Sequence, residues 1–459
     1  MLRLPGERQR LLATTIVAGG VCGLAAVAFH ISVIKSYGLL IDRAVSVPGR
    51  AWIWWTILTP ALGGLVAGLG LTYWVPAAAG SGIPQVKVAY ADRYGAITIK
   101  ETIGKFVLCV LQLGSGISLG LEGPTVQICA GVTSFLSRLA RLSPTNQRRM
   151  ASVGMAAGIA AAFNAPIAAV TFTLEELIGT LDQTMPSGVI VAGALAAVVE
   201  HVILGANPVF HVPRLQTYTL AKASSLLWYA LLGLLAAIVS VAFTDSLLAL
   251  RAWFKRLRRI PKWLQPSMGG AATGCLAVLA IGFFHWNGIA GDPYKTLTQA
   301  LLGNLPVTAM AALCLLKLAA TVTSYSSGGA GGIFAPALFM GGMLGGAVGY
   351  LDVTVFHHPA DSIGAFAVVG MGAVFAGIIR APMTSILIIF EMTGGYGLVL
   401  PLMIANMSAF ALARHWRHKQ IYVALMEQDG IVLERDDAGE KPGWSGPPVV
   451  DESSASVRL

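Results

Sequence analysis

One acidic residue, Glu122, interrupts an otherwise apolar stretch in the segment Gly120-Leu121-Glu122-Gly123-Pro124-Thr125. A carboxylate at membrane depth is costly, so chains keep one mainly where it faces a water-filled path and exchanges protons or ions. The glycines beside it let the backbone come close to a small ligand, and the helix expected after Pro124 offers free amide groups that attract anions. The segment therefore predicts a protonatable group where an anion would bind, an arrangement that could link anion movement to proton movement.

Two further segments, Gly80-Ser81-Gly82-Ile83-Pro84-Gln85 and Gly332-Ile333-Phe334-Ala335-Pro336, also combine glycines with the start of an expected helix. Their glycines expose backbone N–H groups, and Ser81 adds a hydroxyl donor. Such donors can replace the water shell of an anion without a full positive charge, which would bind too tightly for turnover. Close helix packing through small residues would explain one such segment. Three in one chain, two of them related by a repeat, favour an anion path.

The chain contains an internal repeat, and its matching residues fall at two slightly different offsets. Three landmarks return 216 positions later (370 minus 154): Gly154-Met155 at Gly370-Met371, Ala165-Pro166 at Ala381-Pro382, and Glu175 at Glu391. Upstream, four residues return 212 positions later (317 minus 105): Lys105, Gly116, Gly120 and Pro124 correspond to Lys317, Gly328, Gly332 and Pro336. The two copies are each about 210 residues long and are joined near residues 205–225. Repeats in transporters are often inverted, and the binding site then lies at their interface near the bilayer midplane.

The composition is that of a membrane protein. Hydrophobic residues make up 55% of the 459 residues and charged residues only 12%, whereas soluble domains have about 25% charged residues. Sheet is not expected, because open strand edges cannot face lipid. Long apolar spans are expected near residues 11–35, 52–75, 185–204, 226–250, 268–285 and 307–322, and pieces too short or too broken to span alone near 80–92, 120–136, 154–163, 332–350 and 366–378. The predicted fold class is an all-α polytopic membrane protein with two inverted-topology repeats of tilted and broken helices.

The predicted organisation has four parts: a cytoplasmic N-terminal segment (1–14), a first membrane repeat (15–215), a second membrane repeat (216–428) and a disordered cytoplasmic tail (429–459). The apolar run from Leu11 continues through Val33, which predicts a retained transmembrane helix rather than a signal peptide. The five cysteines have no metal-ligand spacing, so no metal and no cofactor are expected.

The net charge of +9 does not indicate a nucleic-acid partner. The basic residues gather in short connectors and tails, as cytoplasmic loops do under the positive-inside rule. These clusters are Arg3, Arg8 and Arg10; Arg251 through Lys262; and Arg414 through Lys419. Both termini are therefore expected on the cytoplasmic side.

Together, the segments Gly80–Pro84, Gly120–Pro124 and Gly332–Pro336 resemble, in order and separation, the three signature segments of the CLC family of chloride channels and chloride/proton antiporters. The resemblance spans roughly residues 15–425, without C-terminal regulatory domains, as in prokaryotic members. It implies a homodimer in the cell inner (plasma) membrane, with a separate pore in each subunit. The implied activity is not enzymatic: it is secondary active transport that exchanges chloride ions for protons across a lipid bilayer.

The resemblance also implies roles for single residues. Ser81 and Tyr422 resemble the serine and tyrosine whose hydroxyls donate to one dehydrated chloride. The backbone N–H groups of Ile333 and Phe334 resemble the donors from the second repeat. Glu122 resembles the gating glutamate, which competes with chloride for the outer site and swings away when it is protonated.

A second glutamate, Glu176, resembles the inner proton glutamate of the exchangers, because it follows Asn164 by twelve residues as in their pattern. Its neighbour Glu175 is the counterpart of Glu391 across the repeat. Glu175 could lie in the inner proton path itself, or it could hold the end of a helix.

Two positions depart from the family pattern. Leu121 stands where Arg or Lys is usual, and the missing cation should weaken anion attraction at the outer mouth. Gln85 replaces an acid that is common at its position, and the sequence does not indicate the effect of that replacement.

Three alternatives stay open at this point. A passive chloride channel would have the same fold, although channels often replace the inner glutamate. A fluoride/proton antiporter would usually lack the serine and the tyrosine of the chloride site. The third alternative is an intramembrane serine protease that uses Ser327 with His30 or His285, but neither histidine is expected to lie at membrane depth as a base.

Overall fold

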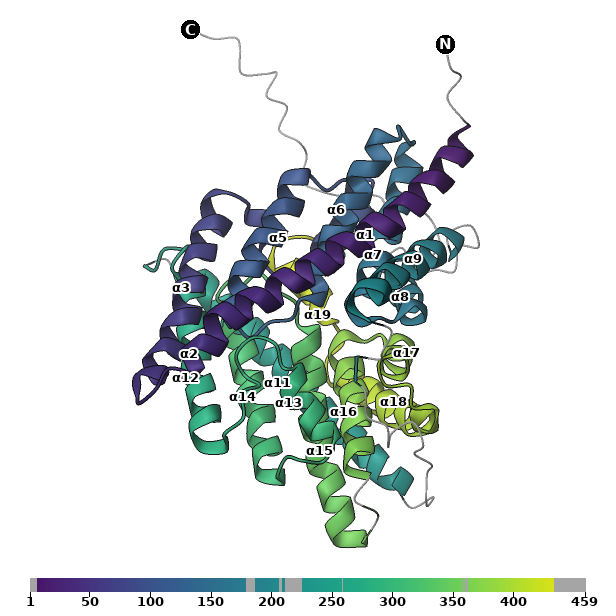
Figure 1. Ribbon diagram of the computed structural model, residues 1–459. Coiled ribbons are helices and arrows are strands. Elements are labelled where there is room, and N and C mark those ends of the chain that lie inside the picture. Colours follow the sequence, from purple (N-terminus) through teal and green to yellow (C-terminus); the bar gives the residue numbers. More distant parts are fainter. Residues whose placement is uncertain are drawn as a thin grey trace.

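The chain is helical throughout the part that the computed structural model describes, which comprises residues 6–178, 186–205, 209–210, 225–257, 259–357, 359 and 362–432 (Figure 1). The first half contains α1 (Glu7–Tyr37), α2 (Arg43–Val45), α3 (Ala51–Tyr73), α4 (Ile83–Asp92), α5 (Ile99–Gly114), α6 (Glu122–Leu139), α7 (Pro144–Phe163), α8 (Pro166–Phe172) and α9 (Pro186–Leu204). The second half contains α11 (Ser225–Arg256), α12 (Gln265–Phe284), α13 (Tyr294–Leu301), α14 (Val307–Ser326), α15 (Phe334–Phe356), α16 (Ser362–Ile379), α17 (Pro382–Thr393), α18 (Val399–Trp416) and α19 (Ile421–Gln428). Residues 433–459 of the predicted tail lie outside the described residues, as does Arg3.

Nine helical segments within these ranges are long and apolar enough to cross a membrane, so the chain is a multi-pass membrane protein. The six predicted long spans correspond to α1, α3, α9, α11, α12 and α14, and the short piece near 80–92 corresponds to α4. The prediction was wrong for the pieces near 332–350 and 366–378. They belong to α15 and α16, which have 23 and 18 residues and are among the nine. The pieces near 120–136 and 154–163 belong to α6 and α7, which are not among the nine.

The physical reason for this error is that many glycines lie inside helices as contact surfaces and do not break them. A Cβ at Gly341 of α15 would overlap the carbonyl oxygen of Gly370 of α16, and a Cβ at Gly370 would overlap that of Gly341. Small residues let helix backbones approach closely in membranes. Every residue of α16 is buried, so this helix lies at the centre of the second half.

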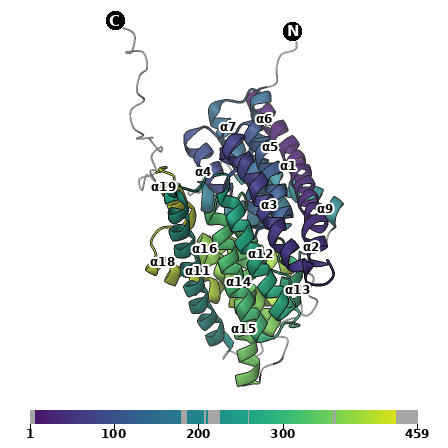
Figure 2. The same cartoon turned by 90° about the vertical axis from the view of Figure 1, so that its left-hand side faces the viewer.

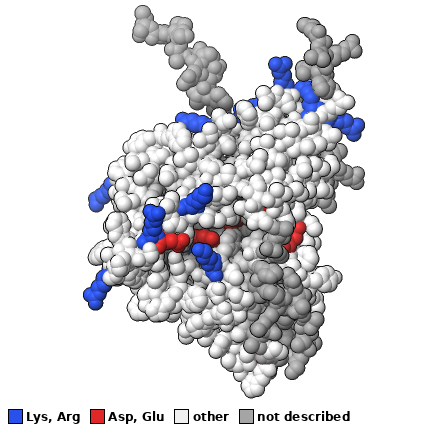
Figure 3. Space-filling view, viewed as in Figure 1, with Lys and Arg blue, Asp and Glu red and all other residues white. Residues whose placement is uncertain are grey.

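The two repeats form the two halves of the molecule. Figure 1 shows α5, α6 and α7 in the upper half and α14, α15 and α16 in the lower half, and the turned view in Figure 2 shows the same separation. The recurring residues pair α5 with α14, α6 with α15, α7 with α16 and α8 with α17. Much of the face in Figure 3 has no charged side chains, as expected for a surface that meets lipid.

Reciprocal hydrogen bonds at the junction show that the repeats are related by a two-fold axis. The Gly120 amide donates to the Gly332 carbonyl at 2.7 Å, and the Gly332 amide donates to the Gly120 carbonyl at 2.6 Å. These two glycines are equivalent in the repeat. When two equivalent residues make the same contact with each other, a two-fold axis relates them. The axis therefore passes between Gly120 and Gly332.

A second reciprocal pair links Glu175 and Glu391. The Glu391 carboxylate accepts from the amides of Ile167 (3.0 Å) and Ala168 (2.7 Å), at the start of α8. The Glu175 carboxylate accepts from the amides of Met383 (3.2 Å) and Thr384 (2.9 Å), at the start of α17. Each glutamate therefore caps a helix of the other repeat, where unpaired amides and the helix dipole favour a negative charge.

Candidate anion and proton site

The three glycine-rich segments meet at the junction of the repeats. The Gly80 amide donates to the Gly329 carbonyl at 2.9 Å, and the Gly331 amide donates to the Gly80 carbonyl at 3.0 Å, beside the Gly120–Gly332 pair. Gly82 has φ 103°, which side chains rarely allow. A Cβ at Gly123 would meet both the carbonyl and the hydroxyl oxygen of Ser81. The glycines therefore let three loops close around one point.

Two buried hydroxyls face each other at this point. Ser81 and Tyr422 are both 0% exposed, and neither hydroxyl makes a hydrogen bond within the described part of the chain. The Tyr422 hydroxyl lies close to Ser81. An unpaired buried hydroxyl costs about 1–3 kcal/mol, and two that share one space indicate a ligand that accepts hydrogen bonds. The chain thus brings together two side chains that are more than 300 positions apart (422 minus 81).

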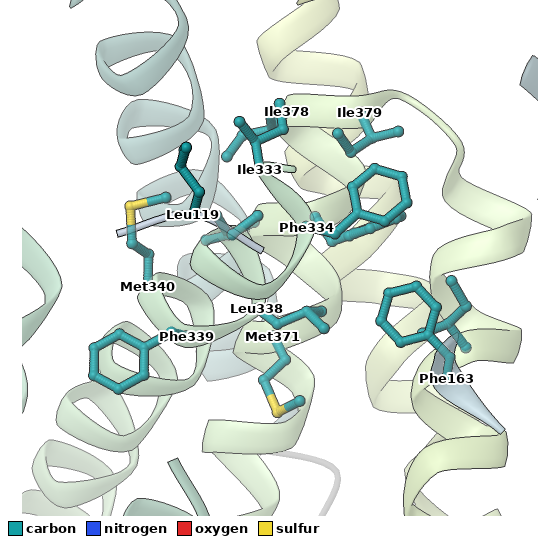
Figure 4. Close-up of a cluster of buried hydrophobic side chains, with 14 of the residues drawn as sticks. Leu119, Phe163, Ile333, Phe334, Leu338, Phe339, Met340, Met371, Ile378 and Ile379 are labelled. Atoms are coloured by element: carbon teal, nitrogen blue, oxygen red, sulfur yellow. The ribbon is translucent and has the colours of Figure 1, made fainter. Parts of the chain in front are cut away.

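Helix N-termini surround the same point. Phe334 is the first residue of α15 and Ile333 is its N-cap, so helix geometry leaves their amides without acceptors inside the helix. The Phe334 ring lies 6.5 Å from the Tyr422 ring and 5.0 Å from the Phe375 ring (centroid distances). Figure 4 shows Ile333 and Phe334 among apolar side chains that include Leu119, Ile378 and Ile379. Amide donors in an apolar wall suit a small anion that has lost its water.

Glu122 is 0% exposed and opens α6 at this junction. Its Oε1 accepts from the hydroxyl of Tyr294 at 2.6 Å, and its Oε2 lies 3.4 Å from the amide of Ala335 in α15. The carboxylate of the first repeat is therefore held by two donors of the second. The sequence prediction missed Tyr294. The repeat gives no sign of it, since the residue that opens the equivalent helix α4 is Ile83, which has no side-chain donor.

Two buried lysines hold the equivalent loops. The Lys105 ammonium donates to the carbonyls of Ala78 (2.9 Å) and Gly80 (2.6 Å), in the loop before α4. The Lys317 ammonium donates to three carbonyls in the loop before α13, those of Gly288 (2.9 Å), Ile289 (3.1 Å) and Gly291 (3.5 Å). Both lysines are 0% exposed. Their charges are thus directed to backbone carbonyls, and the loops are fixed.

The two adjacent glutamates, Glu175 and Glu176, point to different partners from the π-helical turn Thr173–Ile178. Glu175 caps α17, as described above. Glu176 Oε1 lies 2.6 Å from the ammonium of Lys87 in α4, and the two side chains are 1% and 13% exposed. The sequence prediction did not include Lys87, because no motif joins positions that are 89 residues apart.

The two departures from the family pattern have separate structural outcomes. Gln85 fixes the first glycine-rich loop: its Oε1 accepts from the Gly82 amide at 3.0 Å, and its Nε2 donates to the Ala79 carbonyl at 2.8 Å. A glutamine can both donate and accept, so it ties the two ends of the loop together. Leu121 is 9% exposed and belongs to the apolar core, so it supplies no charge.

The protease alternative has no support in the geometry. The Ser327 hydroxyl is buried and donates to the Ser324 carbonyl at 3.0 Å, at the end of α14. His285 ends α12, and His30 in α1 interacts electrostatically with Asp292. Ser327 is thus engaged with the backbone and is not activated by a base, which a serine nucleophile requires.

Comparison with known proteins decides the family. The family model described as "Voltage gated chloride channel" matches residues 63–414. The chain belongs to the voltage gated chloride channel family. Within this family it is 32% identical, over 435 residues, to a protein of Citrobacter koseri named H(+)/Cl(-) exchange transporter ClcA, covering 93% of this chain and 90% of the relative. The protein of the same name from Salmonella typhimurium is 31% identical over the same coverage.

Solved structures agree with the family fold. A slow cyanobacterial Cl-/H+ antiporter matches with a TM-score of 0.83 and 25% identity, over 92% of this chain and 98% of the other. A eukaryotic CLC transporter matches with a TM-score of 0.76 and 20% identity, over 93% and 76%. A CLC-type fluoride/proton antiporter matches with a TM-score of 0.74 and 21% identity, over 90% and 97%. The last two likenesses bear on the fold alone.

Proposed function

We propose that this protein is a secondary active transporter that exchanges chloride for protons across a membrane. One observation carries the proposal: the buried Glu122 carboxylate lies at the helix N-termini that also surround the unpaired hydroxyls of Ser81 and Tyr422. An acid and an anion site at one place can exclude each other. The names of the ClcA relatives, which are H(+)/Cl(-) exchange transporters, support the same activity.

In the proposed mechanism, one chloride ion accepts hydrogen bonds from the hydroxyls of Ser81 and Tyr422 and from the amides of Ile333 and Phe334. These neutral donors replace its water and leave it free to depart, because no ammonium or guanidinium contacts it. When Glu122 is ionised, its carboxylate occupies the outer end of the anion path. Protonation removes its charge, the side chain swings away, and chloride passes.

Protons from the inner side arrive through Glu176. This acid is nearly buried, and its pairing with Lys87 holds it in place next to α4. The geometry of its neighbour supports the choice between the two acids, since both oxygens of Glu175 are engaged by the start of α17. The proton then crosses the apolar interior to Glu122, along transient water.

The assembly proposed is a homodimer with one pore in each subunit, in the cell inner membrane. The helices α8, α9, α17 and α18 carry exposed apolar side chains that a second copy would cover: Ile167, Ile190, Val198, Val202, Met383, Leu400, Met403 and Met407. The basic clusters support a cytoplasmic position for both termini, as the positive-inside rule predicts.

A liposome assay that follows chloride and proton movement together tests the proposal. A chloride gradient is expected to drive protons uphill in the unmodified protein. In Glu122→Gln, which resembles the protonated acid, proton movement is expected to vanish while chloride still crosses. Intact proton pumping in that variant would contradict the role of Glu122. Chloride movement without any proton movement in the unmodified protein would instead identify a channel, and coupled movement of fluoride but not chloride would identify a fluoride/proton antiporter.

A further inference from the structure

We infer that Tyr294 is a latch that holds the Glu122 carboxylate in the position that closes the outer end of the anion path. This inference rests on the proposed function, in which Glu122 is the gate. It adds a positioning residue that sets how readily this gate opens, and it assigns that residue to the second repeat.

The contact itself is a short, charge-assisted hydrogen bond. The Tyr294 hydroxyl donates to Glu122 Oε1 at 2.6 Å, whereas the Ala335 amide lies 3.4 Å from Oε2. Hydrogen bonds with an ionised partner are about twice as strong as neutral ones. The phenol is therefore the stronger of the two donors, and Glu122 must break this bond before it can swing away.

The hydroxyl is held in place before it meets the acid. The Tyr294 amide donates to Asp292 Oδ1 at 3.0 Å, and its ring packs edge-on against Phe210, with centroids 5.5 Å apart. The preceding loop is fixed by Lys317 through three carbonyls. Because these contacts already restrict the side chain, little rotamer freedom is lost when the bond to Glu122 forms.

The latch responds to the charge of Glu122. A phenol hydroxyl binds a carboxylate more strongly than it binds the neutral acid, so protonation of Glu122 weakens the bond and opens the gate. The other ionisable groups that act on Glu122 are Asp292, Lys317 and Tyr422. All three stay unchanged in Tyr294→Phe. A change in the pH dependence of that variant therefore reports on the removed hydroxyl.

The experiment measures chloride efflux from proteoliposomes as external pH is varied, in Tyr294→Phe and in the control Tyr37→Phe. The Tyr37 hydroxyl, at the end of α1, donates to the Ala290 carbonyl at 3.2 Å, so the control removes a buried hydroxyl that contacts the same loop without touching Glu122. Tyr294→Phe is expected to raise efflux roughly tenfold where Glu122 is ionised, and much less in acid, because about 1.4 kcal/mol of gate closure is a factor of ten. Acid activation should also begin at a higher external pH. The efflux of Tyr37→Phe should stay within about twofold of that of the unmodified protein, a smaller change than the loss of one net hydrogen bond at the gate would cause.

Two further variants separate a latch from a structural role. In a Glu122→Ala background, Tyr294→Phe should have no additional effect, because the carboxylate is gone. Tyr294→His restores a donor and should return part of the slow efflux. Equal fold-changes with and without Glu122, or a Tyr294→Phe variant that behaves as Tyr37→Phe, would overturn the latch.

The two hypotheses fail separately. If Glu122→Gln still pumps protons, the proposed function is wrong, whatever Tyr294 does. If Glu122→Gln loses coupling but Tyr294→Phe matches Tyr37→Phe, only the latch is wrong.

Discussion

The two repeats share some polar residues and differ in others. The shared polar residues bind the backbone, whereas the unshared ones have the proposed transport roles. Lys105 and Lys317 are equivalent, and both hold loop carbonyls. Glu175 and Glu391 are also equivalent, and they cap each other's helices in the same way. Shared polar residues therefore build the frame.

The acids with proposed transport roles lack acidic counterparts. Glu122 opens α6, and its equivalent 212 positions later is Phe334, which opens α15. Glu176 is equivalent to Met392, 216 positions later. The donor Tyr294 opens α13, whereas the buried Ile83 opens α4. The two-fold frame is thus symmetric, but the acids with proposed roles in proton transfer lie only in the first repeat.

The largest expected effect is the loss of proton transport when an acid without a counterpart in the other repeat is replaced. Replacing an acid that has such a counterpart should not cause it. Glu176→Gln should abolish proton transport and leave chloride flux, which becomes passive. Glu391→Gln removes an equal charge from a helix cap and should leave coupling intact. The liposome assay of chloride and proton movement measures both. If Glu175→Gln abolishes proton movement and Glu176→Gln does not, the spacing from Asn164 has identified the wrong member of the pair.

Replacing either of the two equivalent lysines should lower stability by a similar amount, but only one replacement should affect chloride binding. Lys105→Met and Lys317→Met each remove charged hydrogen bonds from buried carbonyls, which should lower the free energy of unfolding by about 3–5 kcal/mol. Only the Lys105 loop carries Ser81, so only Lys105→Met should also weaken chloride binding. Thermal unfolding in detergent and calorimetry with chloride measure the two quantities. Equal loss of chloride affinity in both variants would contradict the division between the loops.

The smallest effect should come from the reciprocal caps. Glu175→Gln and Glu391→Gln should each lower the free energy of unfolding by about 1 kcal/mol, since a helix cap typically contributes about that much. The loss should be somewhat larger for Glu175→Gln, because Glu175 Oε2 also accepts from the Thr384 hydroxyl at 2.6 Å. The two losses should add in the double variant because the two carboxylates cap different helices. Thermal unfolding measures this. A large loss for one variant alone would show that its glutamate has a second role.

The sequence predicts the residues that the two repeats share better than the residues in which they differ. Glycines, prolines and one rare lysine were enough to find the repeat, and the repeat predicts the junction where Gly120 meets Gly332. Tyr294 and Lys87 were missed because each meets its glutamate only after folding, at separations of 172 and 89 positions. The lengths of α15 and α16 were misjudged because a glycine that breaks a helix and one that packs against another helix look alike in sequence.

The backbone bonds at the junction also restrict how transport can proceed. Many transporters alternate access by rocking one repeat against the other around a fixed site. Here the repeats are joined beside that site by hydrogen bonds among Gly80, Gly120, Gly329, Gly331 and Gly332. Rocking would break these bonds and expose their amides and carbonyls in an apolar interior, where each unpaired group costs several kcal/mol. The chain should therefore cycle by rotating individual side chains inside a stationary body, and a crosslink placed across the repeats should leave it working.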